Sequence, residues 1–178
     1  CVKLATLGDH NAKNAIAAAT VSSLAKIPVD KIIQGLETFE PVPGRMRSHA
    51  LPHYGSKALL IDDTYNANPE SMRAAIDVLS HYEGEKILII GDMGELGKKA
   101  AQYHTSIGSY INKKKVDYVI GIGQLTKHTI DRCKGNAKWF ENKKALIRYV
   151  KSKMKKNTHV LVKGSRFMKM EEVVEALT

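Results

Sequence analysis

The chain has 178 residues, 43% of them hydrophobic and 26% charged, which is enough for one domain with its own core or one domain with an appendage. No apolar run approaches the ~20 residues that cross a bilayer, and no secretory signal is visible, so we expect no membrane partner. The formal net charge of +10 raises the question of nucleic-acid binding. Because the lysines fall in short groups and the aromatic residues, only 6% of the chain, do not interleave with them, we expect no nucleic acid either.

The two cysteines, Cys1 and Cys133, are too few for a disulfide framework, and no Cys-x-x-Cys is present. This usage is typical of a reducing cytoplasm. Because the chain begins with Cys1 rather than Met, we expect a piece of a longer protein or a processed product.

The first part of the chain predicts two helices and a linker. An alanine-rich helix follows Gly8, with Asp9 as its cap, and ends before Pro28; a second helix starts at Val29. Two short helices cannot enclose a core alone. Pro41 to Arg45 contains two prolines and a glycine, which suit an extended linker, so we divide the chain into residues 1–44 and 45–178.

The second part predicts an α/β fold. A hairpin over 46–61 precedes short apolar strands at 86–90, 118–120 and 159–162, with a weaker strand at 137–140. Amphipathic helices are expected between them, at about 69–79, 97–112, 125–132 and 145–154, and after the last strand at 168–177. Continuous apolar strands that alternate with helices indicate a Rossmann-like, mainly parallel sheet covered by helices on both faces.

The most suggestive stretch is residues 60–72, an apolar strand that turns abruptly into polar residues before a helix capped by Asn68 and opened by Pro69. Ligands bind at such junctions in open α/β sheets, although Asx residues there are equally often turn and cap residues. Three other strand ends, at 91–92, 121–123 and 163–166, should lie at the same edge of a parallel sheet. We therefore expect one crevice formed by all four.

The other constellations are less specific. Gly121-Ile122-Gly123 lacks the third glycine of a dinucleotide fingerprint and is explained as readily by a turn. Lys163, Ser165 and Arg166 could hold a carboxylate or phosphate, or could be solvated. The seven histidines lack ligand spacing, so no metal site is predicted, and no phosphate-binding Gly-x-x-x-x-Gly-Lys-[Ser/Thr] is present.

Together these motifs resemble the Mur ligases, the ATP-dependent amide-forming enzymes of peptidoglycan precursor synthesis. Residues 8–15 look like the Gly-x-His-Asn-x-x-Asn-Ala helix at the end of the family's central ATPase domain, and 43–45 like the Gly-Arg at the junction to its C-terminal domain. Residues 62–72, 91–97 with His104, and 163–171 are similar to the version in the member that adds D-alanyl-D-alanine.

The resemblance implies the C-terminal part of a ligase that joins D-alanyl-D-alanine to UDP-N-acetylmuramoyl-tripeptide. In that family ATP phosphorylates the peptide carboxylate, Mg²⁺ neutralises phosphate charge, and the amine attacks the acyl phosphate. Residues 1–44 would be the last helices of the central ATP-binding domain. The phosphate loop and magnesium ligands would lie outside this chain, so no catalytic residue is assigned and the isolated chain is predicted to be an inactive monomer.

The resemblance also implies roles for individual residues. Asn11 and Asn14 would face adenine, Arg45 the phosphates and Asp63 the ribose hydroxyls, while Asp62 would be structural. The predicted substrate-binding residues are Tyr65, Asn66, Asn68, Lys163, Ser165 and Arg166, the last three for the dipeptide carboxylate. His10 is assigned packing or hydrogen bonding rather than catalysis.

Three alternatives stay open. The nearest is a sister Mur ligase or folylpolyglutamate synthase, the second a non-catalytic module that binds a nucleotide or other ligand, and the third a basic nucleic-acid binder.

Overall fold

The computed structural model describes residues 2–4, 6 and 8–178, without the side chains of Asp9 and His10. Cys1 and the side-chain role expected for His10 therefore lie outside the described residues. The chain divides into two compact units, Cys1–Val42 and Pro43–Thr178. In the first unit the two predicted helices are present as α1 (Asp9–Leu24) and α2 (Val29–Glu37). The cap of α1 was predicted wrongly, because Gly8 rather than Asp9 occupies the N-cap position.

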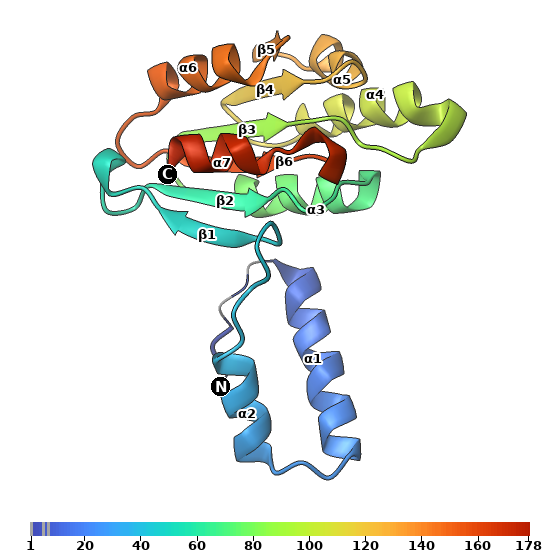
Figure 1. The fold of residues 1–178 in the computed structure, drawn as a ribbon, viewed down its shortest axis with the longest axis vertical. Helices are drawn as coiled ribbons and strands as arrows, with labels where there is room; N and C mark the ends of the chain where they lie inside the picture. Colours follow the sequence, from blue (N-terminus) through green and yellow to red (C-terminus); the bar gives the residue numbers. More distant parts are fainter. Residues whose placement is uncertain (1, 5, 7) are drawn as a thin grey trace. The chain divides into compact units, whose positions relative to one another are not determined.

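The second unit is built on one six-stranded sheet with the order β1-β2-β6-β3-β4-β5 (Figure 1). Its strands are β1 (Arg47–Ala50), β2 (Leu59–Asp63), β3 (Lys86–Ile90), β4 (Tyr118–Ile122), β5 (Asn136–Phe140) and β6 (His159–Lys163). β1 runs antiparallel to β2, as the first arm of the predicted hairpin. All the other pairs are parallel. The predicted fold class is confirmed.

Helices cover both faces of this sheet (Figure 1). Three pack side by side on one face: α3 (Pro69–Ser80), α4 (Ala100–Ile111) and α5 (Thr126–Arg132). The other face carries α6 (Lys143–Lys153) and α7 (Glu171–Leu177). The chain steps across the sheet from β2 to β5 and then returns to β6. Because parallel crossovers are right-handed, this reversal of direction moves the later helices to the opposite face.

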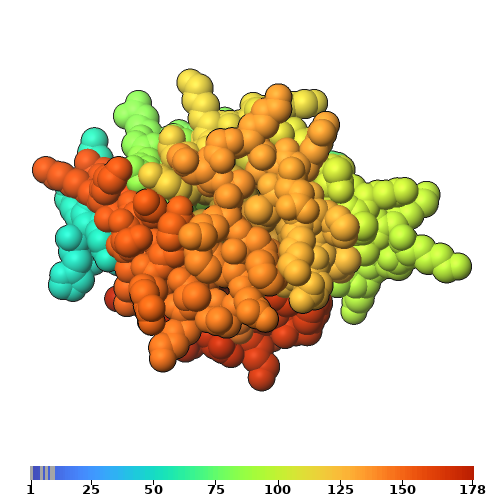
Figure 2. All heavy atoms as spheres, turned by 90° about the horizontal axis from the view of Figure 1, so that it is seen from above, coloured from blue at the N-terminus to red at the C-terminus, as the bar shows by residue number. Residues whose placement is uncertain are grey.

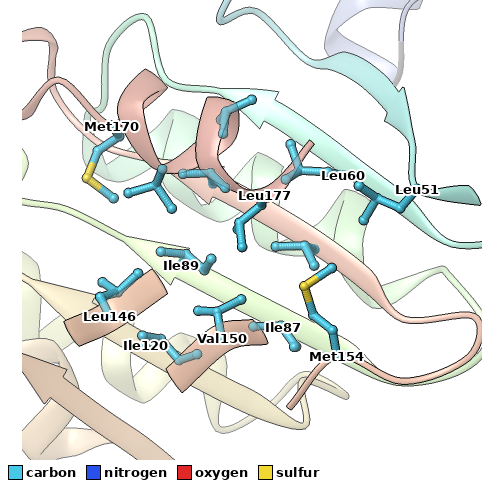
Figure 3. Packing of buried hydrophobic residues seen from close by; sticks show 14 of the residues in the cluster. Leu51, Leu60, Ile87, Ile89, Ile120, Leu146, Val150, Met154, Met170 and Leu177 are labelled. Atoms are coloured by element: carbon cyan, nitrogen blue, oxygen red, sulfur yellow. The ribbon is translucent and has the colours of Figure 1, made fainter. Parts of the chain in front are cut away.

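The central strands are apolar on both sides because helices cover both faces of the sheet. Leu60, Ile87 and Ile89 point toward α6 and α7, where they pack with Leu146 and Leu177 (Figure 3). The intervening strand residues, such as Ile61, Leu88 and Leu161, are fully buried on the α3–α4 side. Every strand residue from Lys86 to Ile90 is therefore buried.

Two helix starts differ from the sequence prediction. A 3₁₀ turn, η2 (Gly97–Lys99), precedes α4. The last helix starts at Glu171 rather than 168, because η3 (Arg166–Met168) is closed by Lys169 in a left-handed conformation, φ 48°. This break turns Met170 into the core, where it is fully buried.

The space-filling view looks onto the edge of the second unit formed by α5, β5 and α6, from which long side chains project (Figure 2). Among the described residues, no helix is long and apolar enough to cross a membrane.

Candidate functional site

The carboxyl ends of the central strands bring the predicted stretches together. In the parallel register, Asp63 at the end of β2 lies beside Lys163 at the end of β6, and Lys163 lies beside Ile90 at the end of β3. Neighbouring residues in parallel register point to the same face, so the side chains of Asp63 and Lys163 can meet. The expected convergence of strand ends is confirmed.

Asp63 and Lys163 form a buried ion pair. The Lys163 Nζ lies 2.6 Å from Asp63 Oδ2 and also donates to the Asn66 carbonyl oxygen at 2.8 Å. The lysine side chain is only 2% exposed, and that of the aspartate 12%. The sequence interpretation had directed Lys163 toward a ligand carboxylate, but in the structure the carboxylate it holds is that of Asp63. The other Asp63 oxygen, Oδ1, accepts no hydrogen bond from the described residues.

Asp62, near the end of β2, holds the loop that follows this strand in place. Asp62 accepts hydrogen bonds from the Thr64 hydroxyl at 2.6 Å, the Thr64 N–H at 3.2 Å and the Gly44 N–H at 3.0 Å. The Tyr65 N–H in turn donates to the Gly44 carbonyl at 2.9 Å. These bonds tie the linker segment to the loop and agree with the structural role predicted for Asp62.

The loop ends at a capped helix. The Asn68 side chain accepts from the Ser71 N–H at 2.8 Å while the Ser71 hydroxyl accepts from the Asn68 N–H at 3.1 Å, and Pro69 is the first residue of α3. The predicted cap is confirmed. The Asn66 Oδ1 accepts a hydrogen bond from the Ala67 N–H at 2.8 Å, and Asn66 is exposed.

Arg45 and Tyr65 form the exposed part of the site. The guanidinium carbon of Arg45 lies 4.1 Å from the centroid of the Tyr65 ring, a cation–π contact that orients the cation while leaving it open to solvent. Tyr65 is 44% exposed. A planar cation held in this way suits paired phosphate or carboxylate oxygens.

Ser165 joins three loops. Its buried hydroxyl accepts from the Gly94 N–H at 2.8 Å and donates to the Ala67 carbonyl at 3.2 Å, while its own N–H donates to the Asp92 carbonyl at 3.0 Å. Arg166 next to it is exposed and pairs with Glu171 at 3.0 Å. Of the three residues predicted to hold a carboxylate, Arg166 is thus the one that solvent reaches most readily.

Asp92 lies at the same edge, and the sequence analysis assigned it no individual role. Its carboxylate accepts from both the N–H and the hydroxyl of Thr126 at 2.7 Å, which anchors the start of α5 to the end of β3. A Cβ atom at Gly123, whose φ is +108°, would collide with this carboxylate. The turn interpretation is therefore correct for Gly123, whereas Gly121 lies within β4. For Asp92, the available signal was a Gly-Asp directly after an apolar strand.

His104 lies behind this edge and is also fully buried. Its Nε2 accepts from the Met93 N–H at 3.1 Å, which places the ring proton on Nδ1, 3.1 Å from the Thr129 hydroxyl. Burial lowers the pKa of His104, an effect that the nearby Asp92 only partly opposes. The neutral imidazole thus joins the loop after β3 to α4 and α5.

Asn11 and Asn14 lie in α1, in the other unit, three residues apart on the helix. Asn14 is exposed and Asn11 is half-buried. Within residues 2–4, 6 and 8–178 no group of three or more His, Cys, Asp or Glu side chains is arranged to hold a metal ion.

The chemistry of the edge is that of binding and orientation. It presents an exposed guanidinium on an aromatic ring, a carboxylate with one open oxygen, and backbone held rigid by buried polar side chains. Such groups suit a polar, anionic ligand with hydroxyl groups. Fold and site together define the class: an α/β domain whose polar side chains gather at the carboxyl ends of parallel strands, where open α/β sheets bind their ligands.

The particular family follows from comparison with known proteins. The family model described as "Mur ligase, glutamate ligase domain" matches residues 44–166, and the chain belongs to this family. It is 43% identical over 178 residues to a UDP-N-acetylmuramoyl-tripeptide–D-alanyl-D-alanine ligase from Buchnera aphidicola, a match that covers 99% of the chain and 38% of that relative.

Solved structures agree. MurF from Acinetobacter baumannii is similar with a TM-score of 0.87 and 32% identity, over 99% of this chain and 39% of that one. The MurF ligase from Thermotoga maritima, solved in complex with ADP, has a TM-score of 0.87 and 27% identity, over 99% of this chain and 40% of that one. The chain thus spans about two fifths of the length of the relatives it matches.

Proposed function

We propose that the chain is the C-terminal part of an ATP-dependent ligase that joins D-alanyl-D-alanine to UDP-N-acetylmuramoyl-tripeptide through an acyl phosphate. The observation that carries this proposal is the 43% identity, over almost the whole chain, to a relative named for that reaction. The gathering of the same motifs at one sheet edge supports it.

The proposed nucleotide contacts involve the exposed guanidinium of Arg45 and the Asp63 carboxylate, of which one oxygen pairs with Lys163. Arg45, oriented by Tyr65, would meet phosphate oxygens. Asp63 would accept ribose hydroxyls through Oδ1, with Lys163 holding the other oxygen in place. Asn11 and Asn14 would face adenine, where a carboxamide can both donate and accept.

The acceptor half concerns the dipeptide. Arg166 is our first choice for its carboxylate, with the Ser165 hydroxyl nearby, while Tyr65, Asn66 and Asn68 would shape the edge between the two ligands. Lys163 would act on this half indirectly, by fixing the loop through the Asn66 carbonyl.

Magnesium would supply charge neutralisation at the phosphates. No described cluster of this chain suits it, so we propose that its ligands, like the phosphate loop, belong to the part of the relatives that the chain does not span. We further propose a cytoplasmic, monomeric protein.

The test uses the full-length parent enzyme. Arg45→Ala and Asp63→Ala should each lower turnover about a hundredfold, since each removes one or two charge-assisted contacts worth ~1.5–3 kcal/mol apiece. Arg47→Ala is the matched control, because Arg47 is also an exposed arginine but lies two residues away on β1. Unchanged ligation in both site variants would favour a non-catalytic binding module instead.

Acceptor choice separates the sister enzymes. The parent should use D-alanyl-D-alanine in preference to single amino acids, whereas a sister Mur ligase or folylpolyglutamate synthase would prefer the latter. The isolated 178-residue chain should show no ligation, and ATP-dependent product from it would contradict the proposal.

A further inference from the structure

The positive charge of the chain is concentrated in one segment. Residues 112–156 contain fourteen Lys and Arg against three Asp and Glu, whereas the rest of the chain contains fourteen against fifteen. The whole formal charge of +10 therefore comes from a quarter of the sequence. Solubility alone does not require such a local excess of positive charge, because positive and negative residues are nearly equal in number in the rest of the chain.

In the fold this segment forms one edge of the second unit. Its middle part contains β4, α5, β5 and α6; β5 is the edge strand, α5 covers it on one face and α6 lies on the other. Its two ends leave this edge, since Lys114 pairs with Asp77 of α3 and Lys155 with Glu85, just before β3. Figure 2 looks onto this side, where the orange spheres of β5 and α6 lie in front. We call it the basic edge, residues 112–156.

Most cations of the basic edge are unpaired. Only Lys114, Lys143 and Lys155 lie within ion-pair distance of a carboxylate in the described part of the chain, with Asp77, Glu172 and Glu85 as their partners. The other eleven have none there. Twelve of the fourteen are lysines, whose ammonium groups act as hydrated point charges rather than as bidentate forks.

The aromatic residues of the basic edge lie beneath lysines. Lys138 Nζ is 4.7 Å from the centroid of the Tyr149 ring and 5.2 Å from that of Phe140, and Lys127 Nζ is 4.2 Å from that of Trp139. Aromatic and basic residues thus lie together at this edge, which the sequence analysis did not predict. These rings are covered, however, and none is an exposed large hydrophobic residue, so they offer no free face on which bases could stack.

We propose that the basic edge binds the surface of a lipid bilayer that contains anionic head groups. Its many point charges, without exposed stacking rings or apolar side chains, match a broad negative plane better than a nucleic acid. This revises our expectation of no membrane partner, and it concerns adsorption to the surface, not insertion.

The candidate functional site would stay accessible in such a complex. Four interstrand spacings of ~4.8 Å separate β2 from β5, about 19 Å across the sheet. The part of the site at the end of β2, with Asp63 and Lys163, thus lies away from β5, whereas Asp92 adjoins the basic edge through Thr126. The proposal does not rest on the proposed ligase activity.

The test is co-sedimentation of the 178-residue chain with vesicles of phosphatidylcholine, with or without one third phosphatidylserine. Wild-type chain should bind the anionic vesicles alone, and less at higher salt. The triple variant Lys144→Gln, Arg148→Gln, Lys151→Gln removes three exposed charges from one stripe of α6. It should lower the partition coefficient about a hundredfold, since each charge near an anionic leaflet contributes a factor of about five.

The matched control is Lys57→Gln, Lys98→Gln, Lys99→Gln, which removes the same charge from exposed positions outside the basic edge. It should bind within about twofold of wild type. Equal loss in both variants, or no binding of wild type to anionic vesicles, would overturn the proposal. Tighter retention on a single-stranded oligonucleotide than on vesicles at equal salt, lost in the α6 variant, would replace it with a nucleic-acid partner.

Discussion

A lysine with 2% of its side chain exposed is costly unless its charge is compensated, and in Lys163 the compensation is the Asp63 carboxylate and the Asn66 carbonyl. The burial of Lys163 is tolerated because the Asp63 carboxylate lies within hydrogen-bond distance of its ammonium group. The pair consequently holds both the end of β2 and the loop that follows it.

The first prediction concerns this pair. Lys163→Met should destabilise the chain by ~3–5 kcal/mol, because it leaves the Asp63 carboxylate buried without its cation. Urea unfolding of the 178-residue chain measures the change.

The double variant Lys163→Met, Asp63→Leu is the control, because it removes both charges. It should recover most of the loss, and Lys163→Arg should not reproduce the native pair, since a planar fork replaces a point charge. A loss below about 1 kcal/mol for Lys163→Met would mean that water compensates Asp63 instead.

Sequence reasoning could place these polar residues at one edge of the sheet, but it could not predict which of them contact each other. Asp63 and Lys163 are 100 residues apart, and their contact depends on β6 lying between β2 and β3 in a particular register. The residues near Lys163 in the sequence do not indicate this strand order. The sequence analysis therefore interpreted Lys163 as a cation that binds a ligand. Asp62 and Asn68 could be assigned correctly because their partners lie within three residues or in the adjacent linker.

At the scale of elements, one imidazole connects the loop after β3 with α4 and α5. His104 can accept from Met93 only while Nε2 is unprotonated, so the neutral ring is part of the packing. This makes the contact between these elements sensitive to pH.

The second prediction follows from the lowered pKa of His104. The folded state binds fewer protons than the unfolded one, so stability is complete above pH 6.5 and falls as pH decreases below it, by up to ~1.4 kcal/mol per unit. Urea unfolding between pH 7.5 and pH 5 measures the slope. His104→Gln should flatten it; an identical slope in the variant would assign the effect elsewhere, for instance to His159, whose pKa burial also lowers.

The third prediction concerns the start of α3. Asn68→Ala removes the side-chain acceptor of the Ser71 N–H, which is one half of the capping box, and should cost ~0.5–2 kcal/mol. Asn68→Asp keeps the acceptor and should cost less than half as much. Equal losses in thermal unfolding would show that the carboxamide has another partner that matters more.

Element types were largely predictable, because strands buried on both faces and amphipathic helices leave distinct patterns. Helix starts were harder. Asp9 is an ordinary cap residue, yet Gly8 takes that position in α1. The start of α7 depends on Lys169 adopting a left-handed conformation so that Met170 can enter the core, a tertiary requirement that overrides local preference.

At the scale of the whole molecule, the two units differ in how much they bury. In the first, Ile16, Val21 and Leu24 of α1 are 66%, 67% and 79% exposed, whereas the second has a core on each face of its sheet. Short helices with little buried apolar surface are marginal in water.

The fourth prediction is a gradient of hydrogen exchange in the 178-residue chain. Amides of β2, β6 and β3 should exchange most slowly, through global unfolding, and those of α1 and α2 fastest, through local opening. Mass spectrometry of proteolytic fragments resolves the difference. Comparable protection of α1 and β6 would show that the helices are stabilised far more than their exposure implies.

The insertion of β6 between β2 and β3 also has a consequence for synthesis. A nascent chain that has left the ribosome as far as Asn157 contains five strands, but the central position of the sheet is empty and two apolar strand edges stand open. The sheet cannot close until residues 159–163 emerge. A premature stop codon between residues 157 and 163 should therefore yield an aggregating product rather than a shortened but folded protein, because it removes the strand that closes the sheet.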